Sequence, residues 1–310
     1  MGCVTTSSCS DGGSDIRSET TRNTTRDTTT TSTTSIRRQG AISAGATGSF
    51  EFDGYEPLKD QPLTVWYDAP PAGDLPSAKV LFVMHGQQRN GEEYRDDWIP
   101  HARSAGALLI VPEFSEEFYP DADSYNVGNL VTDDGEAVPE SSWSFSAIEP
   151  LFDFVQAETG NLSDGYYLFG HSAGAQFVHR FMLLKSNNRV KRAVSANAGW
   201  YTAPESEVEF PYGLRNSPST ETSLTRALAA PLTVLLGEED VDTDSESLRS
   251  TPQADRQGPN RLARGKFFFR AGQEAAEALG TPFGWELETV AGATHSNAEM
   301  APAAASILFD

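Results

Sequence analysis

Short apolar runs alternate with amphipathic stretches along this chain from about residue 60 onward. Apolar residues at helical spacing predict four helices, and β-rich apolar runs predict the strands between them. This alternation is typical of an α/β protein with a mostly parallel central sheet and helices on both faces. We expect strands at 63–67, 79–84, 107–111, 166–169, 192–196, 232–236 and 286–290, and helices at 90–105, 144–158, 174–184 and 297–308.

Two long segments break this rhythm. Residues 113–142 and 201–225 are rich in Gly, Pro, Ser and acidic residues and have no clear period. Pro112 is expected to end the strand before the first of them. Connections of this length inside a compact domain usually form lids or binding loops. The sequence therefore predicts that these segments cover or line a site.

The N-terminal segment has a different composition. Residues 1–35 contain 12 Thr and 7 Ser and almost nothing apolar, so they cannot bury enough surface to offset the entropy of ordering. We predict a disordered Ser/Thr-rich tail or tether over 1–45 and one folded domain over 46–310. The two cysteines of the chain, Cys3 and Cys9, both lie in the tail.

The first residues, Met1-Gly2-Cys3, have three interpretations. Gly2 with Thr6 fits the N-myristoylation pattern. Gly2-Cys3 before a Ser/Thr-rich tether also resembles the start of a mature bacterial lipoprotein, with a lipid anchor at Cys3. The third interpretation is a plain flexible terminus. A lipoprotein would lie outside the cytoplasm at a membrane surface, which is the location we expect, and the sequence also leaves a cytoplasmic location open.

Charge and hydropathy narrow the classes of function. The 310 residues include 44 acidic and 23 basic ones, a formal net charge of −21. Such a chain repels phosphate backbones, so we expect no nucleic-acid partner. No stretch approaches the ~20 apolar residues of a spanning helix. An acidic chain with so few lysines resembles halophilic proteins, and a merely acidic protein from outside the cytoplasm is the alternative.

The chemistry centres on Gly170-His171-Ser172-Ala173-Gly174. A predicted strand enters this G-x-S-x-G string and a predicted helix leaves it, which is the arrangement of a nucleophile elbow. The glycines allow the tight turn that lifts the Ser172 hydroxyl clear of the sheet. The sequence therefore predicts Ser172 as a nucleophile.

A serine nucleophile needs a base and an acid that orients the base. In the order serine, acid, histidine, His295 is the only histidine that follows Ser172 at the end of a predicted strand. The acid is expected just after the strand 232–236, where Asp240 has the best spacing and Asp242 is the alternative. The other carboxylates of this cluster, Glu238, Glu239 and Asp244, are weaker candidates.

The oxyanion formed on acyl attack needs two backbone N–H donors. We expect one from Ala173, which follows the nucleophile. The second is expected from Gln87, in the loop after the strand 79–84. These assignments describe a serine hydrolase.

The runs 169–180 (FGHSAGAQFVHR) and 292–300 (GATHSNAEM), with His85-Gly86 before them, resemble α/β-hydrolases of the polyhydroxybutyrate-depolymerase and feruloyl-esterase-like branch. The resemblance implies an α/β-hydrolase fold and a serine carboxylesterase that needs no cofactor and no metal. It implies Ser172 as nucleophile, Asp240 or Asp242 as acid and His295 as base.

The expected partner is a small or oligomeric ester, hydroxyacyl or aryl, and the sequence says nothing of oligomeric state. Substrate-lining candidates are His85, Trp143, Trp200 and Tyr201. The basic run 257–264 with Arg270 either pairs with local acids or holds a substrate carboxylate. The alternatives are a peptidase or acyltransferase on the same fold, and a non-catalytic surface protein that binds through the two long segments.

Overall fold

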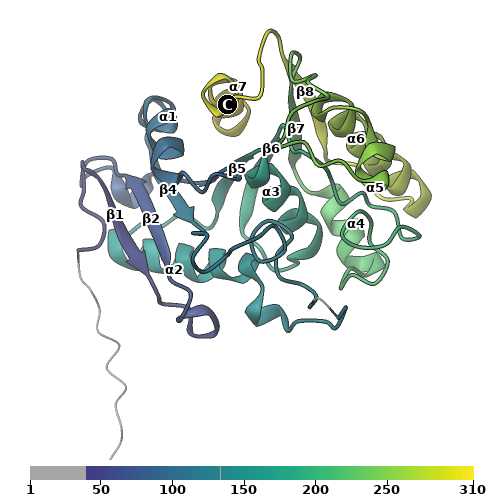
Figure 1. Cartoon of the computed structure of the whole chain (residues 1–310). Coiled ribbons are helices and arrows are strands. Elements are labelled where there is room, and N and C mark those ends of the chain that lie inside the picture. Colours follow the sequence, from purple (N-terminus) through teal and green to yellow (C-terminus); the bar gives the residue numbers. More distant parts are fainter. Residues whose placement is uncertain (1–39, 133) are drawn as a thin grey trace, which may run out of the picture. The chain divides into compact units, whose positions relative to one another are not determined.

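A computed structural model describes residues 40–132 and 134–310 (Figure 1). The described residues belong to one compact unit, and the predicted tail, with Cys3 and Cys9, lies outside them except for 40–45. At that junction the Gly40 and Ala41 amides donate to Glu158, and the Ile42 side chain is buried. No helix of the described part is long and apolar enough to cross a membrane.

The centre of the fold is a sheet of eight strands in the order β1-β2-β4-β3-β5-β6-β7-β8. The first two pairings, β1 with β2 and β2 with β4, are antiparallel, and all the others are parallel. This is the mostly parallel sheet that the sequence predicts, in an α/β-hydrolase fold. The strands are β1 Thr47–Phe52, β2 Leu63–Asp68, β3 Lys79–Met84, β4 Ala107–Glu113, β5 Tyr166–His171, β6 Val190–Ala196, β7 Leu232–Gly237 and β8 Glu286–Val290.

Helices cover both faces of the sheet. Along β3, Val80, Phe82 and Met84 pack into one core cluster, whereas Leu81 and Val83 pack into the other. All five side chains are fully buried, as expected for a strand covered on both sides. Figure 1 shows α1 and α7 over one face and α2 and α3 over the other. The helices are α1 Gly91–Ser104, α2 Ile148–Thr159, α3 Ala173–Leu184, α4 Glu221–Ala229, α5 Pro252–Gln257, α6 Arg261–Leu279 and α7 Asn297–Phe309.

Several elements differ from the sequence predictions. β1, α5 and α6 are absent from them, and α4 begins inside the segment 201–225, which was expected to be irregular. The segment 144–158 begins as a 3-10 turn, Ser144–Ala147, before α2. Pro112 does not end its strand, because β4 pairs with β3 only as far as Ile110 and continues against β2 alone. A proline is tolerated where a strand has a neighbour on one side only.

Candidate active site

Ser172 stands on a strained turn between β5 and α3. Its φ of 58° and ψ of −115° lie in a region that non-glycine residues rarely adopt, at a cost of about 1–3 kcal/mol. Glycine is required on both sides. A Cβ on Gly170 would lie 2.2 Å from the Gly174 carbonyl oxygen, and one on Gly174 would lie 2.0 Å from the Met84 carbonyl oxygen. The predicted elbow is therefore present in the backbone.

Two hydrogen bonds connect Ser172, His295 and Asp240. His295 Nε2 lies 3.0 Å from Ser172 Oγ, and His295 Nδ1 lies 2.8 Å from Asp240 Oδ2. With the imidazole proton on Nδ1, that nitrogen donates to Asp240 while Nε2 accepts from the serine hydroxyl. Asp242 is exposed, and its Oδ1 accepts from the Asp244 amide instead. The structure thus brings together the preferred three residues and leaves Asp242 outside the contact.

Asn197 ties the loops that carry the acid and the base. It follows β6 in a left-handed conformation with a φ of 53°. Its Oδ1 accepts from the Gly237 amide, and its Nδ2 donates to the Thr294 carbonyl. Gly237 also allows a close approach, since a Cβ there would lie 2.6 Å from the Ala293 carbonyl oxygen. One amide side chain therefore fixes the spacing between the segments that bear Asp240 and His295.

Arg261 holds the carboxylate oxygen of Asp240 that His295 does not use. Its Nη1 lies 3.4 Å from Asp240 Oδ1, and the two side chains are only 2% and 1% exposed. Its Nη2 donates to Ser247 Oγ at 2.8 Å. Asp240 is therefore restrained through both oxygens. The basic run 257–264 thus contains an acid-paired arginine at the site, and Arg264 of the same run pairs with Asp255.

His171 packs directly against His295, with the two ring centroids 4.6 Å apart. Its Nδ1 lies 3.1 Å from the Tyr94 hydroxyl. Burial lowers the pKa of His171 well below its usual value, and the charges of His295 and Arg261 add to this effect. A neutral ring in this position adds no positive charge beside His295.

The expected oxyanion donors lie on either side of Ser172. The Ser172 amide itself donates to the Ala196 carbonyl, so it is already engaged. Among the described residues, the amides of Gln87 and Ala173 have no such acceptor. A Cβ on Gly86 would lie 3.9 Å from Ser172 Cβ, so the Gln87 loop comes close to the serine. Both amides therefore lack a protein acceptor close to Ser172, which is what the predicted role as oxyanion donors requires.

His85 is buried beneath the Gly86-Gln87 loop and bonds to it, so it does not line the substrate site, contrary to the prediction from the sequence. It is fully buried, its Nδ1 donates to the Gly86 carbonyl, and its Nε2 accepts from the Phe114 amide. Burial lowers its pKa to about 3. The ring is therefore neutral, as an Nε2 acceptor must be.

Two cavities adjoin Ser172. The triad cleft, of about 520 Å³, contains Ser172, His295 and three carboxylates, Glu93, Asp97 and Glu116. The arginine cavity, of about 340 Å³, shares Gln87, Glu116 and Ser247 with the triad cleft. Both volumes fall within the usual range of ligand sites. The other lining residues of the arginine cavity include Arg89, Asn126, Ala173, Gln176, Trp200 and Arg249.

Of the predicted aromatic lining residues, the structure places Trp200 on the arginine cavity and the other two in the core. Trp143 is 4% exposed and its indole N–H donates to the Val138 carbonyl. Tyr201 is fully buried against His179 and Phe268. Neither residue lines the two cavities. Trp143 lies between two 3-10 turns and packs into the core, and Tyr201 turns into the core after β6.

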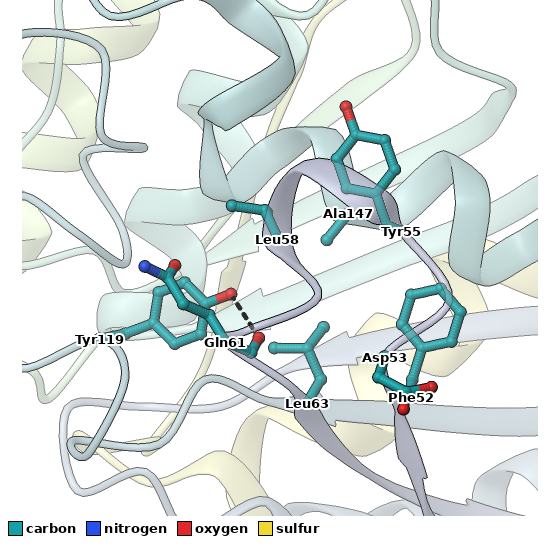
Figure 2. Close-up of a pocket in the computed structure, with 8 residues that line it drawn as sticks. All are labelled: Phe52, Asp53, Tyr55, Leu58, Gln61, Leu63, Tyr119 and Ala147. Atoms are coloured by element: carbon teal, nitrogen blue, oxygen red, sulfur yellow. Dashed lines mark hydrogen bonds between the residues drawn. The ribbon is translucent and has the colours of Figure 1, made fainter.

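A third cavity lies near the segment that joins β1 and β2 (Figure 2). Figure 2 shows its lining residues, among them Phe52, Tyr55 and Leu63, and the hydrogen bond from the Tyr119 hydroxyl to the Gln61 carbonyl. Its volume of about 10 Å³ has room for about one water molecule. A further cavity, of about 490 Å³, lies away from Ser172, at Trp66 and Glu113. The triad cleft and the arginine cavity are lined by Ser172 or its neighbour Ala173, so they are the candidates for a substrate. Across residues 40–132 and 134–310, no group of three or more His, Cys, Asp or Glu side chains is placed to hold a metal ion.

Comparison with solved structures gives close relatives. A poly(aspartic acid) hydrolase-1 from Sphingomonas sp. KT-1 is 41% identical with a TM-score of 0.84, over 86% of this chain and 100% of that one. A poly(3-hydroxybutyrate) depolymerase, LpqC, from Bordetella parapertussis is 38% identical with a TM-score of 0.81, over 86% and 90%. An S-formylglutathione hydrolase from Agrobacterium tumefaciens, at 17% identity and a TM-score of 0.55, over 86% and 94%, shares the fold. Neither a protein-family model nor a curated protein sequence matches the chain.

Proposed function

The chain belongs to the hydrolase family of α/β fold that includes this poly(aspartic acid) hydrolase and this poly(3-hydroxybutyrate) depolymerase, and from that premise we propose that it cleaves carboxylic esters through an acyl-enzyme on Ser172. The observation that carries the proposal is the pair of hydrogen bonds from Ser172 Oγ through His295 to Asp240. Both lengths lie in the range needed for proton transfer.

In the proposed reaction, His295 Nε2 accepts the Ser172 proton as Oγ attacks the ester carbonyl. Asp240 stabilises the imidazolium, and the Gln87 and Ala173 amides donate to the oxyanion. His295 then gives the proton to the leaving alcohol. A water molecule, activated by the same imidazole, releases the acid and restores Ser172.

The charges of the triad cleft favour an ester that is neutral along its length. Three carboxylates line this cleft, and the whole chain carries −21. A poly(aspartic acid) chain carries one carboxylate per residue and would be repelled there, whereas hydroxyacyl repeats are neutral. The burial of Trp143 and Tyr201 removes most of the aromatic wall that an aryl ester would use. Esters of hydroxyacids are therefore the proposed substrates.

Amide hydrolysis is the second candidate, because the 41% identical relative is a poly(aspartic acid) hydrolase. A panel of p-nitrophenyl acyl esters and 3-hydroxybutyrate oligomers, compared with oligo-aspartate and aminoacyl anilides, separates the two. We expect turnover of the esters and a loss of at least ~10³-fold in Ser172→Ala. Ester turnover that survives this substitution would overturn the mechanism, and turnover of the amides alone would overturn the substrate class.

The location and the tail remain predictions. An extracytoplasmic protein with a lipid anchor at Cys3 is our proposal for the intact molecule, and Cys3 lies outside the described residues. The intact mass of natively expressed protein tests it, since an acylated Cys3 adds the mass of its fatty chains. Adaptation to high salt is tested by thermal unfolding in increasing KCl, where a halophilic protein gains stability up to molar salt.

A further inference from the structure

The arginine cavity brings arginines and carboxylates together without a close ion pair: Arg89 and Arg249 line it beside Glu116, Asp121 and Glu246. Seven of the thirteen described arginines pair with an acid within 4.0 Å, whereas Arg89 and Arg249, which line this cavity, and Arg180, which packs on its Trp200, do not. Three further arginines elsewhere, Arg192, Arg226 and Arg270, also have no such pair. In so acidic a chain, unpaired arginines gathered beside a proposed nucleophile are unexpected. The paired ones are Arg95, Arg103, Arg189, Arg215, Arg256, Arg261 and Arg264.

Arg249 is held in place by aromatic contacts. Its guanidinium lies 4.8 Å from the centre of the Trp200 ring and 5.7 Å from that of Tyr212. Its Nε donates to the Tyr212 hydroxyl at 2.7 Å. The stacking and this bond fix the side chain, and they leave both Nη groups free of any protein acceptor in the described part of the chain. A fixed guanidinium with free Nη donors is suited to a planar anion.

Arg180 lies against the same indole ring, 4.1 Å from its centre, and is fully buried. Its Nε and Nη1 donate to Thr202 and Asn126, but its Nη2 is buried without a partner. Burial, and after it the nearby charge of Arg249, lowers the pKa of Arg180 to about 9. The group is therefore still protonated at pH 7. Arg180 and Arg249 thus both pack on Trp200, and the charge of each makes it less favourable for the other to be protonated.

Arg89 and two amides complete the polar lining. Arg89 Nη2 donates to the carbonyls of Tyr119 and Asp121, and its Nε is buried without a partner. The side chains of Asn126 and Gln176 also line the cavity and carry amide donors. Arg89, Asn126 and Gln176 thus place several N–H donors on the wall of the cavity that Ala173 also lines.

The carboxylates that face the cavity are all exposed. They are Glu116, Asp121 and Glu246. Asp121 is engaged with Ser124, whose amide and hydroxyl both donate to it and lower its pKa. Solvent and salt screen these carboxylates and also the exposed Arg249, whereas the buried charge of Arg180 is screened much less.

We propose that the arginine cavity is a subsite for one carboxylate of the substrate, received by Arg249 with the support of the amides of Asn126 and Gln176. This inference rests on the proposed function, because it places the anion next to the acyl-enzyme residue. No described arginine lines the triad cleft, whereas Arg249 lines the neighbouring cavity, so the site selects a neutral ester that carries a single free acid.

Such a carboxylate has two sources. It is the terminal acid of a hydroxyacid oligomer, in which case the enzyme acts on short chains with free ends. It is otherwise the carboxylate of an aspartyl residue next to the cleaved bond. Both present the same planar anion to Arg249, so the shared chemistry defines the subsite and the experiment distinguishes the sources.

The test compares the 3-hydroxybutyrate dimer with its terminal carboxamide, which has the same shape without the charge. We expect the wild-type protein to prefer the free acid by about 10- to 100-fold in kcat/KM, the usual value of charged hydrogen bonds. Arg249→Gln should reduce this preference at least about tenfold. Arg256→Gln, an exposed arginine paired with Glu205, is the matched control and should leave the preference unchanged. An N-acetyl β-aspartyl dipeptide with a free or amidated carboxylate forms the second arm.

Equal turnover of acid and carboxamide by the wild type, or a preference that survives Arg249→Gln in both arms, would overturn the subsite. A binding measurement separates this failure from failure of the proposed function. In Ser172→Ala, calorimetry should show tighter binding of the free acid than of the carboxamide, and Arg249→Gln should abolish the difference. Binding of this kind without any turnover in the wild type refutes the esterase and retains the subsite.

Discussion

The triad and the arginine cavity adjoin each other but are built in different ways. Ser172, Asp240 and His295 each follow a parallel strand, and backbone contacts and Asn197 hold their loops. The arginine cavity is assembled mostly from side chains of irregular segments, together with Ala173 and Gln176 of α3, and Trp200 and Arg249 stack on each other. The sheet therefore fixes the positions of the three triad side chains, whereas the neighbouring cavity depends on segments that vary more readily.

The two long segments, 113–142 and 201–225, are nevertheless each held near their first residues by a buried histidine. His85 Nε2 accepts from the Phe114 amide, where the segment 113–142 starts, and His179 Nε2 accepts from the Thr202 amide, where the segment 201–225 starts. Burial lowers the pKa of both histidines far below the usual value. Neutral imidazoles therefore anchor the walls of the site to its rigid centre, because a protonated ring could not accept these bonds.

The largest effect is expected at the acid of the triad. Asp240→Asn should lower kcat/KM by about 10³- to 10⁴-fold, because an amide no longer holds His295 in the tautomer that accepts the serine proton. Asp242→Asn, the matched control, should stay within about threefold of wild type. Steady-state kinetics on a p-nitrophenyl ester measures both. A larger loss in Asp242→Asn than in Asp240→Asn would show that Asp240 is not the acid that orients His295.

A smaller loss is expected when the support of Asp240 is removed. Arg261→Met leaves the triad intact but frees Asp240 Oδ1 and Ser247, so we expect kcat to fall about 10- to 100-fold with little change in KM. Arg261→Lys should recover part of this loss. Arg270→Met, on the exposed face of the same helix α6, is the control. A normal kcat in folded Arg261→Met protein, checked by thermal unfolding, would contradict the positioning role.

The smallest effect concerns the loop anchors and appears in stability. His85, His171 and His179 have folded-state pKa values below that of the unfolded chain, so the unfolded state binds more protons. Stability is fully present above about pH 6.5 and falls as the pH drops below that value, by about 1.4 kcal/mol per pH unit for each histidine. Urea unfolding at pH 7.5, 6.5 and 5.5 measures the slope. His179→Gln should reduce it by one proton, and an unchanged slope would contradict a neutral anchor.

The sequence predicted the centre of the fold well because buried parallel strands are continuous apolar runs, such as 79–84. It failed for α6, whose packed face is built from small and charged residues. Gly265 and Gly272 lie against Leu236 and Trp285, and Arg261 and Arg264 are buried. A search for apolar residues at helical spacing therefore misses this helix.

The same contrast holds within the site. The three triad residues follow strands, so chain order and motif were enough to propose them. Arg249 and Asn197 carried no motif, because their positions depend on contacts between distant loops. Arg180 stands at the end of the run 169–180, but nothing in that run shows that its side chain packs on Trp200. The prediction of His85 as a lining residue was wrong. His85 directly follows a strand, as a substrate-facing side chain would, but its ring is fully buried.

Labelling with a fluorophosphonate, which reacts with an activated serine, tests directly whether Ser172 is a nucleophile activated by His295. Intact-mass and peptide analysis should find one adduct per chain, on the peptide that contains Ser172, and none in Ser172→Ala. His295→Ala should slow the labelling strongly. An adduct on another residue, or labelling of Ser172 that is independent of His295, would contradict the account.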